Sequence, residues 1–379
     1  MAIYKVNINS PIYIKVANDG GGTESNALSS CTLTISIYSG TYQTSPSTTY
    51  ALRKNEVANN NFVIFEIGEL IKDYITYSFN GTFGNNGLNL WVKTVATPSN
   101  SAGAALSAIT TNMLAFDGVG YFENGFTTET QTNSNTTVSL SSFVGSTSVL
   151  MSNNKIFRES QEILKIPVLA NLSVNSGADT LTGATTVNFK NGSSTVTSVT
   201  VGTGIDTTNT AIEYATSNTA TLTSVDIVKG GSTETILIEE QPCNKFTNLP
   251  VTFVNRFGAL QRVNFFLKSI ESIDVQREEY KANTLTTGAS YSINNHQYKT
   301  RNVMSRESIV LNTGYVNDSY NQVIEELLMS PRCWIFKDSQ QLPVVPQDKQ
   351  VVFKTSLNDR LANYTINFKF AFDKINTIR

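Results

Sequence analysis

Histidine is the side chain on which most acid, base and metal chemistry at neutral pH depends, and this chain has one, His296, in the polar stretch SINNHQYKT. An HExxH zinc motif needs a second histidine, which the sequence lacks, and no segment predicts a Ser-His-Asp triad or a mixed His and Cys zinc set around His296. We therefore predict a surface or hydrogen-bonding role for His296.

Paired carboxylates are the other arrangement that could do chemistry, because a glycosidase needs two of them at a defined separation. Neighbouring glutamates point in different directions along a strand or helix, so a solvated face is the favoured interpretation of each pair. A glycosidase or depolymerase is kept as a minor alternative. The pairs are Glu239-Glu240, Glu278-Glu279 and Glu325-Glu326.

Glycine motifs that cradle phosphates or position a nucleophile are also missing. The sequence has no GxxxxGK[ST], no GxGxxG opening a helix after a strand, and no GxSxG. The GVG at 118–120 and the GTG at 202–204 are predicted to be turns. We expect no catalytic, cofactor-binding or metal-binding residues and no cofactor, and we predict that the chain is not an enzyme.

Cysteine use is sparse. Cys31, Cys243 and Cys333 are too few and too far apart in sequence for a disulfide framework or a zinc site. The prediction is three small thiols, buried or half-buried.

Composition limits the class of protein. Of 379 residues only 15% are charged, and Ser, Thr, Asn and Gly take the polar positions, a bias common in β-rich extracellular and viral proteins. A net charge of -2 argues against non-specific nucleic-acid binding. No apolar run of about 18 residues predicts membrane insertion. The start, MAIYKVNINSPIYIKV, has strand-like alternation and no signal-peptide core, so we expect synthesis in a cytoplasm, or export by a route without such a signal.

The strongest structural pattern lies at 363–372, NYTINFKFAF. Tyr364, Ile366, Phe368, Phe370 and Phe372 alternate with smaller or polar residues, which predicts a strand with one buried face. The expected second layer is a helix that Asn317 or Asp318 caps and that ends at Met329, together with a strand at 333–336. A further strand is expected at 351–354. Strands at 251–254 and 263–267 should flank a turn at 255–258.

Turn signals divide the rest of the chain. We predict a mainly β, multi-domain protein of antiparallel sandwiches, with domains at 1–157, 158–241 and 242–379. The first should carry a short helix near 67–75 and a polar surface loop at 127–142. In the second, six short runs about ten residues apart predict an immunoglobulin-like or fibronectin-like module. The third should combine β-structure with one α-helix.

Several segments of the sequence resemble those of a known protein family. They are SPIYIKV, ISIYSG, TTYALRKN and FEIGELIKDYI near the start, and PCNKFTNLPVTFVNRFGALQRVNFFLKS, LNTGYVNDSYNQVIEELLMSPRCWI and KTSLNDRLANYTINFKFAFDKINTIR near the end. They resemble a family of virion structural proteins of tailed phages that infect marine and Bacteroidetes-type bacteria. The resemblance covers roughly 1–95 and 243–379.

The resemblance implies a structural part of the tail, baseplate or neck, assembled in the host cytoplasm and resident in the virion. Expected partners are copies of the same chain in a ring or other symmetric assembly, and other virion proteins. Absent signals and unpaired cysteines agree with assembly in a cytoplasm. The alternative is a receptor-binding or carbohydrate-binding adhesin, with host surface glycans as its partner. We expect no specific nucleic-acid partner.

Overall fold

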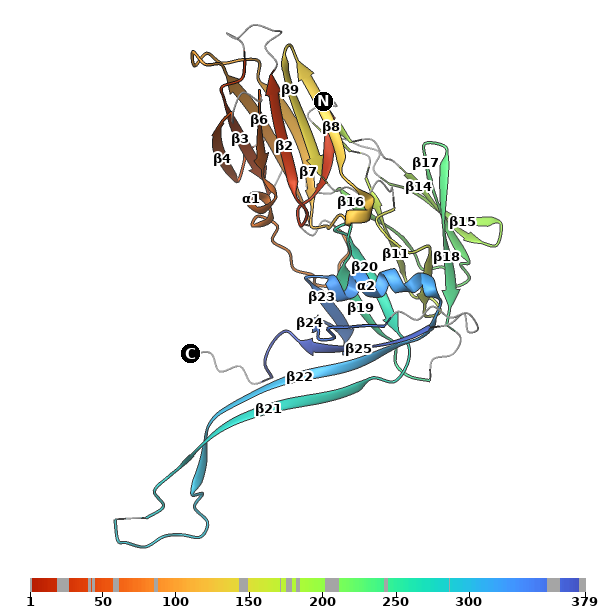
Figure 1. Ribbon diagram of the computed structural model, residues 1–379. Coiled ribbons are helices and arrows are strands. Elements are labelled where there is room, and N and C mark those ends of the chain that lie inside the picture. Colours follow the sequence, from red (N-terminus) through yellow and green to blue (C-terminus); the bar gives the residue numbers. More distant parts are fainter. Residues whose placement is uncertain are drawn as a thin grey trace. The chain divides into compact units, whose positions relative to one another are not determined.

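Strands dominate the structure. In the computed structural model, 58% of the residues lie in strands and 6% in helices, which confirms the expected mainly β fold with several antiparallel sheets (Figure 1). The structure describes residues 2–18, 27–39, 42, 45–56, 61–84, 88–142, 149–170, 172–174, 179–181, 185–201, 211–241, 245–285, 287–352 and 362–374.

The chain forms two compact units. Unit 1 comprises Met1–Pro242 and Phe253–Gln261, and unit 2 comprises Cys243–Thr252 and Arg262–Arg379. The expected boundary at 157/158 falls within unit 1, so the division into three domains stays a prediction.

Two sheets make up the first part of unit 1. One has the order β1-β7-β6-β3-β4 and the other β5-β2-β9-β8. Their bounds are β1 Ile3–Asn7, β2 Ile12–Asn18, β3 Ser30–Tyr38, β4 Thr48–Asn55, β5 Phe62–Glu66, β6 Asn89–Ser99, β7 Ile109–Phe116, β8 Thr127–Asn133 and β9 Thr136–Ser142. A five-residue helix, α1 (Gly68–Lys72), follows β5, and a 3-10 helix spans Phe122–Asn124.

The two sheets share one core. Ile14 of β2 and Leu140 of β9 are buried in the same apolar cluster as Leu33 and Ile35 of β3, with Ile71 of α1 packed among them. A β-sandwich results, because each strand presents every second side chain to the opposite sheet. The predicted short helix near 67–75 is present, although α1 covers only part of that range.

The polar stretch 127–142 is a hairpin, so the prediction of a loop there was wrong. Strands β8 and β9 pair in register from Thr127 opposite Ser142 to Asn133 opposite Thr136. Val138 and Leu140 anchor the inner face, while hydroxyl groups pair across the outer one, such as Thr128 Oγ1 with Ser141 Oγ at 3.0 Å. Cross-strand Thr and Ser pairs stabilise a sheet without apolar alternation on both strands.

The rest of unit 1 holds a five-stranded sheet, β10-β18-β17-β14-β15, and two pairs, β11-β16 and β12-β13. The strands are β10 Lys155–Arg158, β11 Leu164–Leu169, β12 Leu172–Val174, β13 Asp179–Leu181, β14 Thr185–Asn191, β15 Ser194–Val201, β16 Ile212–Ser217, β17 Ser224–Lys229 and β18 Ser232–Glu240. Most of the predicted short runs are strands here. The predicted turn at 202–204 lies outside the described residues.

The predicted turn at 255–258 is confirmed. Gly258 has a φ of 75°, a conformation that favours glycine. The buried Asn255 organises the turn, because its Oδ1 accepts from the backbone N–H groups of Phe257 at 3.1 Å and Ala259 at 3.0 Å. Its Nδ2 donates to the carbonyl of Leu150 at 2.6 Å and to Gln261 Oε1 at 3.0 Å.

Unit 2 is built on a seven-stranded sheet of order β20-β19-β23-β24-β25-β22-β21. The strands are β19 Leu249–Val254, β20 Leu260–Phe265, β21 Ile270–Lys281, β22 Tyr298–Val316, β23 Cys333–Lys337, β24 Gln340–Pro346 and β25 Ala362–Phe370. The helix α2 (Asn321–Met329) follows a 3-10 helix, Asp318–Tyr320.

Strand β25 has the predicted buried face. Tyr364, Ile366, Phe368 and Phe370 are all buried, and the residues between them are exposed or half-buried. Burial of four large side chains contributes on the order of 10 kcal/mol before conformational entropy is subtracted. Phe372 was expected in this row but is 45% exposed, because the strand ends two residues earlier.

The layer that covers this face was predicted only in part. Trp334 lies in β23, which is two strands away from β25 in the same sheet, so it is not in an opposing layer. The sheet curls instead, and the ring of Phe265 in β20 packs edge-on against Phe368 with centroids 5.9 Å apart. Beyond β20, the backbone N–H of Leu267 donates to the carbonyl of Asn312 in β22 at 3.3 Å, so the curl brings the end of one edge back to the sheet.

Helix α2 provides the other cover. Tyr364 of β25 donates a hydrogen bond from Oη to Asn321 at the start of the helix, and Val323, Ile324 and Leu327 are buried. The helix starts later than predicted, and neither Asn317 nor Asp318 caps it with a side chain. It ends as predicted before Pro331, since Ser330 is already extended.

The prediction of a strand at 351–354 was wrong where it can be assessed. Val351 and Val352 are not in a strand, and 353–354 lie outside the described residues. Strand β24 was not predicted, because Pro343 and Pro346 argue against a central strand.

The buried face of β25 can be tested by mutation. We expect Phe368→Asp to abolish soluble folding, because it places an unpaired charge where the side chain is 0% exposed. Phe368→Ala should lower the free energy of unfolding by about 3–5 kcal/mol in urea titrations. Phe372→Ala is the matched control and should cost less than about 1 kcal/mol. Equal losses for the two alanine variants would show that the assigned face is wrong.

Candidate functional site

The carboxylate pairs do not gather into one site. Glu239 and Glu240 form ion pairs with Lys155 and Arg158, and the guanidinium of Arg158 is fully buried. On α2, Glu325 is exposed and Glu326 is buried, so the two side chains point in different directions, as expected. The predicted solvated face was wrong for Glu326, because its side of the helix packs with Val323 and Leu327 against unit 2. The remaining pair, Glu278 and Glu279, is exposed on β21.

The thiols of the described residues do not form a reactive or metal-binding site. Cys31 in β3 and Cys333 in β23 are both buried and free, and Cys243 lies outside the described residues. Burial raises the pKa of each of these two thiols to about 12, so both are protonated at neutral pH and poor nucleophiles. In the described part of the chain, no group of three or more His, Cys, Asp and Glu side chains could hold a metal ion.

The candidate site is a long hairpin that does not contribute to a core, which we call the arm (residues 270–307). Strands β21 and β22 pair antiparallel from Ile270 opposite Val310 to Lys281 opposite Tyr298. Figure 1 shows the two strands leaving the sheet of unit 2 and continuing as a ribbon. A two-stranded hairpin is only marginally stable alone.

The base of the arm is braced by unit 2. Lys337 Nζ lies 2.7 Å from Glu271 Oε1, and Lys374 Nζ lies 2.9 Å from Glu307 Oε1. Arg306 Nε donates to the carbonyl of Phe370 at 2.7 Å. These contacts hold the first part of the ribbon to β23 and to the end of β25.

Beyond the base, the arm exposes apolar side chains. Every residue of β21 is exposed. Ile270, Asp274 and Gln276 share one face of the ribbon with Met304, and Ile273 and Val275 share the other with Val303. Ile273 is 53% exposed, and Ile293 near the tip is 89% exposed. Ile273 and Val275 are neighbours on their face, whereas Ser272 and Asp274 separate Ile270 from Met304 on the other. Contiguous exposed apolar surface marks an interaction site more often than scattered residues do, so the Ile273 face is the stronger candidate.

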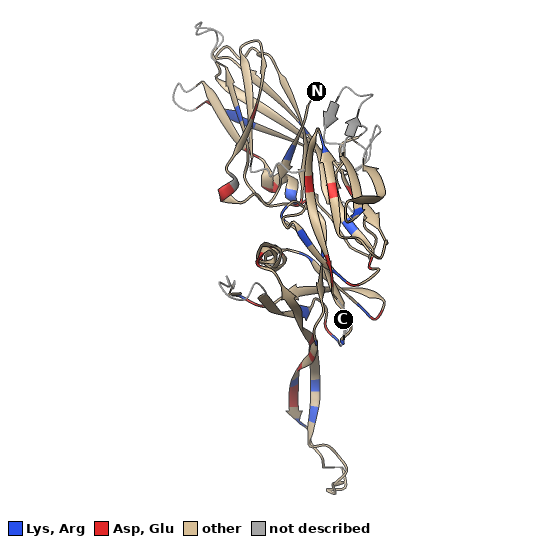
Figure 2. Ribbon diagram, turned by 90° about the vertical axis from the view of Figure 1, so that its right-hand side faces the viewer, with Lys and Arg blue, Asp and Glu red and all other residues tan. Residues whose placement is uncertain are grey.

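Charge is divided between the two strands. Strand β21 has four acidic residues (Glu271, Asp274, Glu278, Glu279) against two basic ones (Arg277, Lys281), a formal charge of -2. Strand β22 has three basic residues (Lys299, Arg301, Arg306) against Glu307, a formal charge of +2. Figure 2 shows red on one strand of the ribbon and the distal blue residues on the other.

Several of these charges have no internal role. Within the described residues, no ion pair or side-chain hydrogen bond involves Glu278, Glu279, Lys299 or Arg301. They lie around a β-bulge, where the register shifts between Glu278 and Glu279. An exposed charge without a partner is cheap in water, so these four residues are available for a partner molecule.

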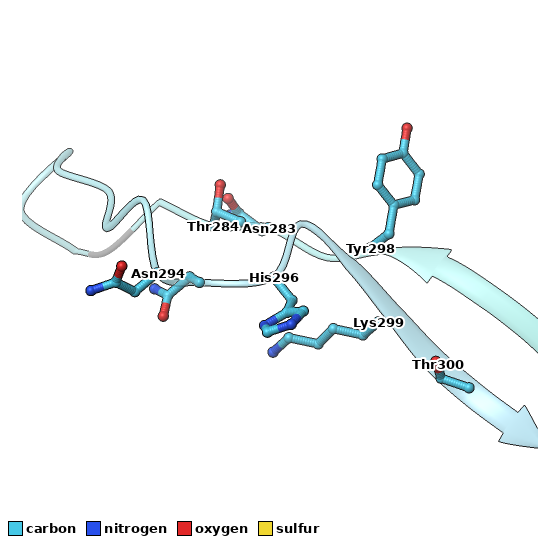
Figure 3. Close-up of a pocket in the computed structure, with 8 residues that line it drawn as sticks. Asn283, Thr284, Asn294, His296, Tyr298, Lys299 and Thr300 are labelled. Atoms are coloured by element: carbon cyan, nitrogen blue, oxygen red, sulfur yellow. The ribbon is translucent and has the colours of Figure 1, made fainter.

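The tip of the arm carries an open pocket with a volume of about 500 Å³, lined by Asn283, Thr284, Asn294, Asn295, His296, Tyr298, Lys299 and Thr300 (Figure 3). Figure 3 shows His296 and Lys299 on one side of the ribbon and Tyr298 on the other. His296 is exposed, which agrees with the predicted surface role. Amides, hydroxyls and one aromatic ring suit hydrogen bonding to a polar ligand.

Sequence reasoning missed the arm. The signal was present, because two runs free of proline flank the stretch 282–297, in which Ser, Thr and Asn are frequent. That stretch is longer than the usual hairpin loop, and neither strand has a clean apolar face to mark it.

Comparisons with known proteins give no family assignment. No family model matches the chain, and a search of curated proteins found no match. No helix in the described part of the chain is long and apolar enough to span a membrane.

The arm should be dispensable for folding. In a variant where an Asn-Gly turn replaces 276–304, we expect the thermal midpoint to stay within about 4 °C of the parent, equivalent to roughly 1 kcal/mol. The reason is that Ile309 and Leu311, which hold β22 to the core, are retained. Differential scanning calorimetry makes the measurement. A much larger fall would show that the arm stabilises unit 2 and is not kept for a partner.

Proposed function

We propose that this chain is a non-enzymatic structural component of a tailed phage particle, in the tail, baseplate or neck, that acts by assembling with copies of itself and with other virion proteins. The observation that supports assembly is the arm, whose β21 is exposed along its whole length and carries large apolar side chains. The type of particle is inferred from the sequence resemblance at 1–95 and 243–379.

Physical chemistry favours assembly for such an arm. A ribbon of two strands has two unpaired edges, and natural proteins pair, cover or charge their edges. Retaining Ile270, Ile273, Val275 and Met304 on an exposed ribbon makes sense when another protein surface covers them after folding. In this proposal the protein is made in the host cytoplasm and resides in the finished virion.

The proposal predicts that purified particles contain the chain in several copies. Quantitative mass spectrometry of gradient-purified particles should give a ratio to the major capsid protein that survives further purification, and electron cryomicroscopy should place the fold in a symmetric layer. A phage replication protein is the control for contamination from the lysate. The idea fails if the chain occurs in infected-cell lysate and never in the particle.

A glycan-binding adhesin is the second candidate, and the tip pocket favours it. Asn283, Asn295 and His296 can hydrogen-bond sugar hydroxyls, and Tyr298, which also lines the pocket, supplies an aromatic ring on the other side of the ribbon from His296. In this reading the host surface glycan is the partner.

The adhesin alternative predicts that the purified chain binds host polysaccharide on a glycan array. Asn295→Ala and Tyr298→Ala should lower the affinity roughly tenfold or more, because each removes a contact inside the pocket. Asn100→Ala, at an exposed turn outside the arm, is the matched control. An array without hits would count against this candidate and would leave the structural proposal standing.

A further inference from the structure

The arm has two open edges. Strand β21 is the last strand of its sheet, so its outer edge (270–281, the acidic edge) has no strand partner among the described residues. Strand β22 pairs with β25 only from Ser308 onward, counted from the tip. Its outer edge at 298–304 (the basic edge) is therefore open too in the described part of the chain. Backbone N–H and C=O groups along both edges are free to accept another strand.

The two edges have opposite charge. The acidic edge has a formal charge of -2 over 270–281, and the basic edge, with Lys299 and Arg301 and no carboxylate, has +2. The part of the acidic edge that is level with the basic edge, 276–281, has Glu278 and Glu279 at its centre with Arg277 and Lys281 on either side, so the complementary charge there comes from the two glutamates. The distal charges of both edges lie at the same height on the ribbon, because Glu278 is opposite Asn302 and Glu279 is opposite Thr300. One arm therefore carries a pair of carboxylates on one edge and a pair of basic side chains at the same height on the other edge.

We propose that the acidic edge of one copy pairs with the basic edge of the next copy, so that the arms form one continuous intermolecular sheet that closes into a ring. This inference rests on the proposed function as an assembling component, and it names both the partner, a second copy of this chain, and the surface. The contact is head-to-tail, which is the type that generates a closed ring when the rotation between neighbours closes.

The chain directions agree with this pairing. Strand β21 runs toward the tip and β22 runs back, and all arms point the same way when copies are related by rotation about an axis along the arms. Strand β21 of one copy is then antiparallel to β22 of its neighbour. Closure of such a sheet removes every open edge, as it does in an up-and-down barrel.

The side chains fit the same arrangement. When arms lie level at the usual strand spacing of about 4.8 Å, Glu278 and Glu279 of one copy lie beside Lys299 and Arg301 of the next. Val275 and Val303 share a face, so apolar neighbours also meet across the junction. Cross-strand pairs of both kinds stabilise a sheet.

Other occupants fit less well. Pairing two acidic edges would place two strands of charge -2 side by side, and like charges directly opposite each other are destabilising. Nucleic acid would be attracted by the basic edge but repelled by the acidic edge of the same arm. A different virion protein that fills the edges is the outcome that the experiment below separates from self-pairing.

The test uses charge reversal in the full-length chain. E278K/E279K changes the acidic edge from -2 to +2, and K299E/R301E changes the basic edge from +2 to -2. Each variant should shift the purified protein from ring oligomer to monomer in light scattering and native mass spectrometry, with an apparent dissociation constant raised roughly tenfold or more. The quadruple variant restores opposite charges and should restore the ring.

Controls keep folding separate from assembly. Glu129→Lys reverses an exposed carboxylate on β8, an edge strand outside the arm, and should leave the ring intact. Circular dichroism should show the same β-content in every variant. An equimolar mixture of the two double variants should associate, because each supplies the edge charge that the other has lost.

The outcomes distinguish this inference from the proposed function. Parent protein that stays monomeric, a ring that survives either double reversal, or a quadruple variant that remains monomeric overturns edge pairing between copies. If the chain is nevertheless present in purified particles, the proposed function stands and a different virion protein covers the arm. If a ring forms and responds to both reversals but particles lack the chain, the inference stands and the proposed function fails.

Discussion

The pairing of β22 with β25 is the constraint on which unit 2 depends. From Ser308 to Val316, β22 pairs with the strand that carries Ile366 and Phe368, and its own Ile309 and Leu311 are buried. The same strand then continues past the core as one side of the arm. The core end of β22 therefore positions the exposed arm. Because this end is held by β25, the arm needs no core of its own to keep its direction at the base.

The bend in β22 shows how the strand serves both roles. Its register with β25 shifts between Asn312 and Tyr315, where Gly314 has a φ of 76°. Asn312 Oδ1 accepts from the N–H of Gly314 at 2.9 Å, and the carbonyl of Asn312 accepts from Leu267. A bulge of this kind increases local twist, and it lies where the sheet curls to bring Phe265 against Phe368.

The sequence predicts elements well where burial is one-sided and local. The alternation at Tyr364 to Phe370 and the asparagine and glycine of the turn at 255–258 each have one physical cause that a single strand or turn displays. The prediction of a loop at 127–142 was wrong because β8 gains stability from hydroxyl pairs and from the apolar row of β9. The composition of β8 itself does not show either contribution. Trp334 was misplaced because the curl of a seven-stranded sheet is a property of all its strands.

The arm was not predicted because neither face of its strands is buried in a core, so its residues show no apolar alternation. Where both faces stay in water, packing of the monomer imposes no apolar period on the strands. Mixed faces such as Ile273 and Val275 beside Glu271 and Arg277 are poor for a core and suitable for a surface that must stay soluble first. The division of charge between strands would remain hidden in a net charge of -2 for the whole chain.

The contacts at the base of the arm give this mixture a physical logic. Pairing of β22 with β25 and the ion pairs of Lys374 with Glu307 and Lys337 with Glu271 hold the base of the ribbon to unit 2. Farther out, the acidic residues of β21 and the bulge beside Glu279 disfavour pairing of like edges, which is the usual route to aggregation from an exposed strand. Charges that disfavour pairing of like edges, while leaving pairing of complementary edges possible, are one way in which a protein can keep long exposed strand edges without aggregating.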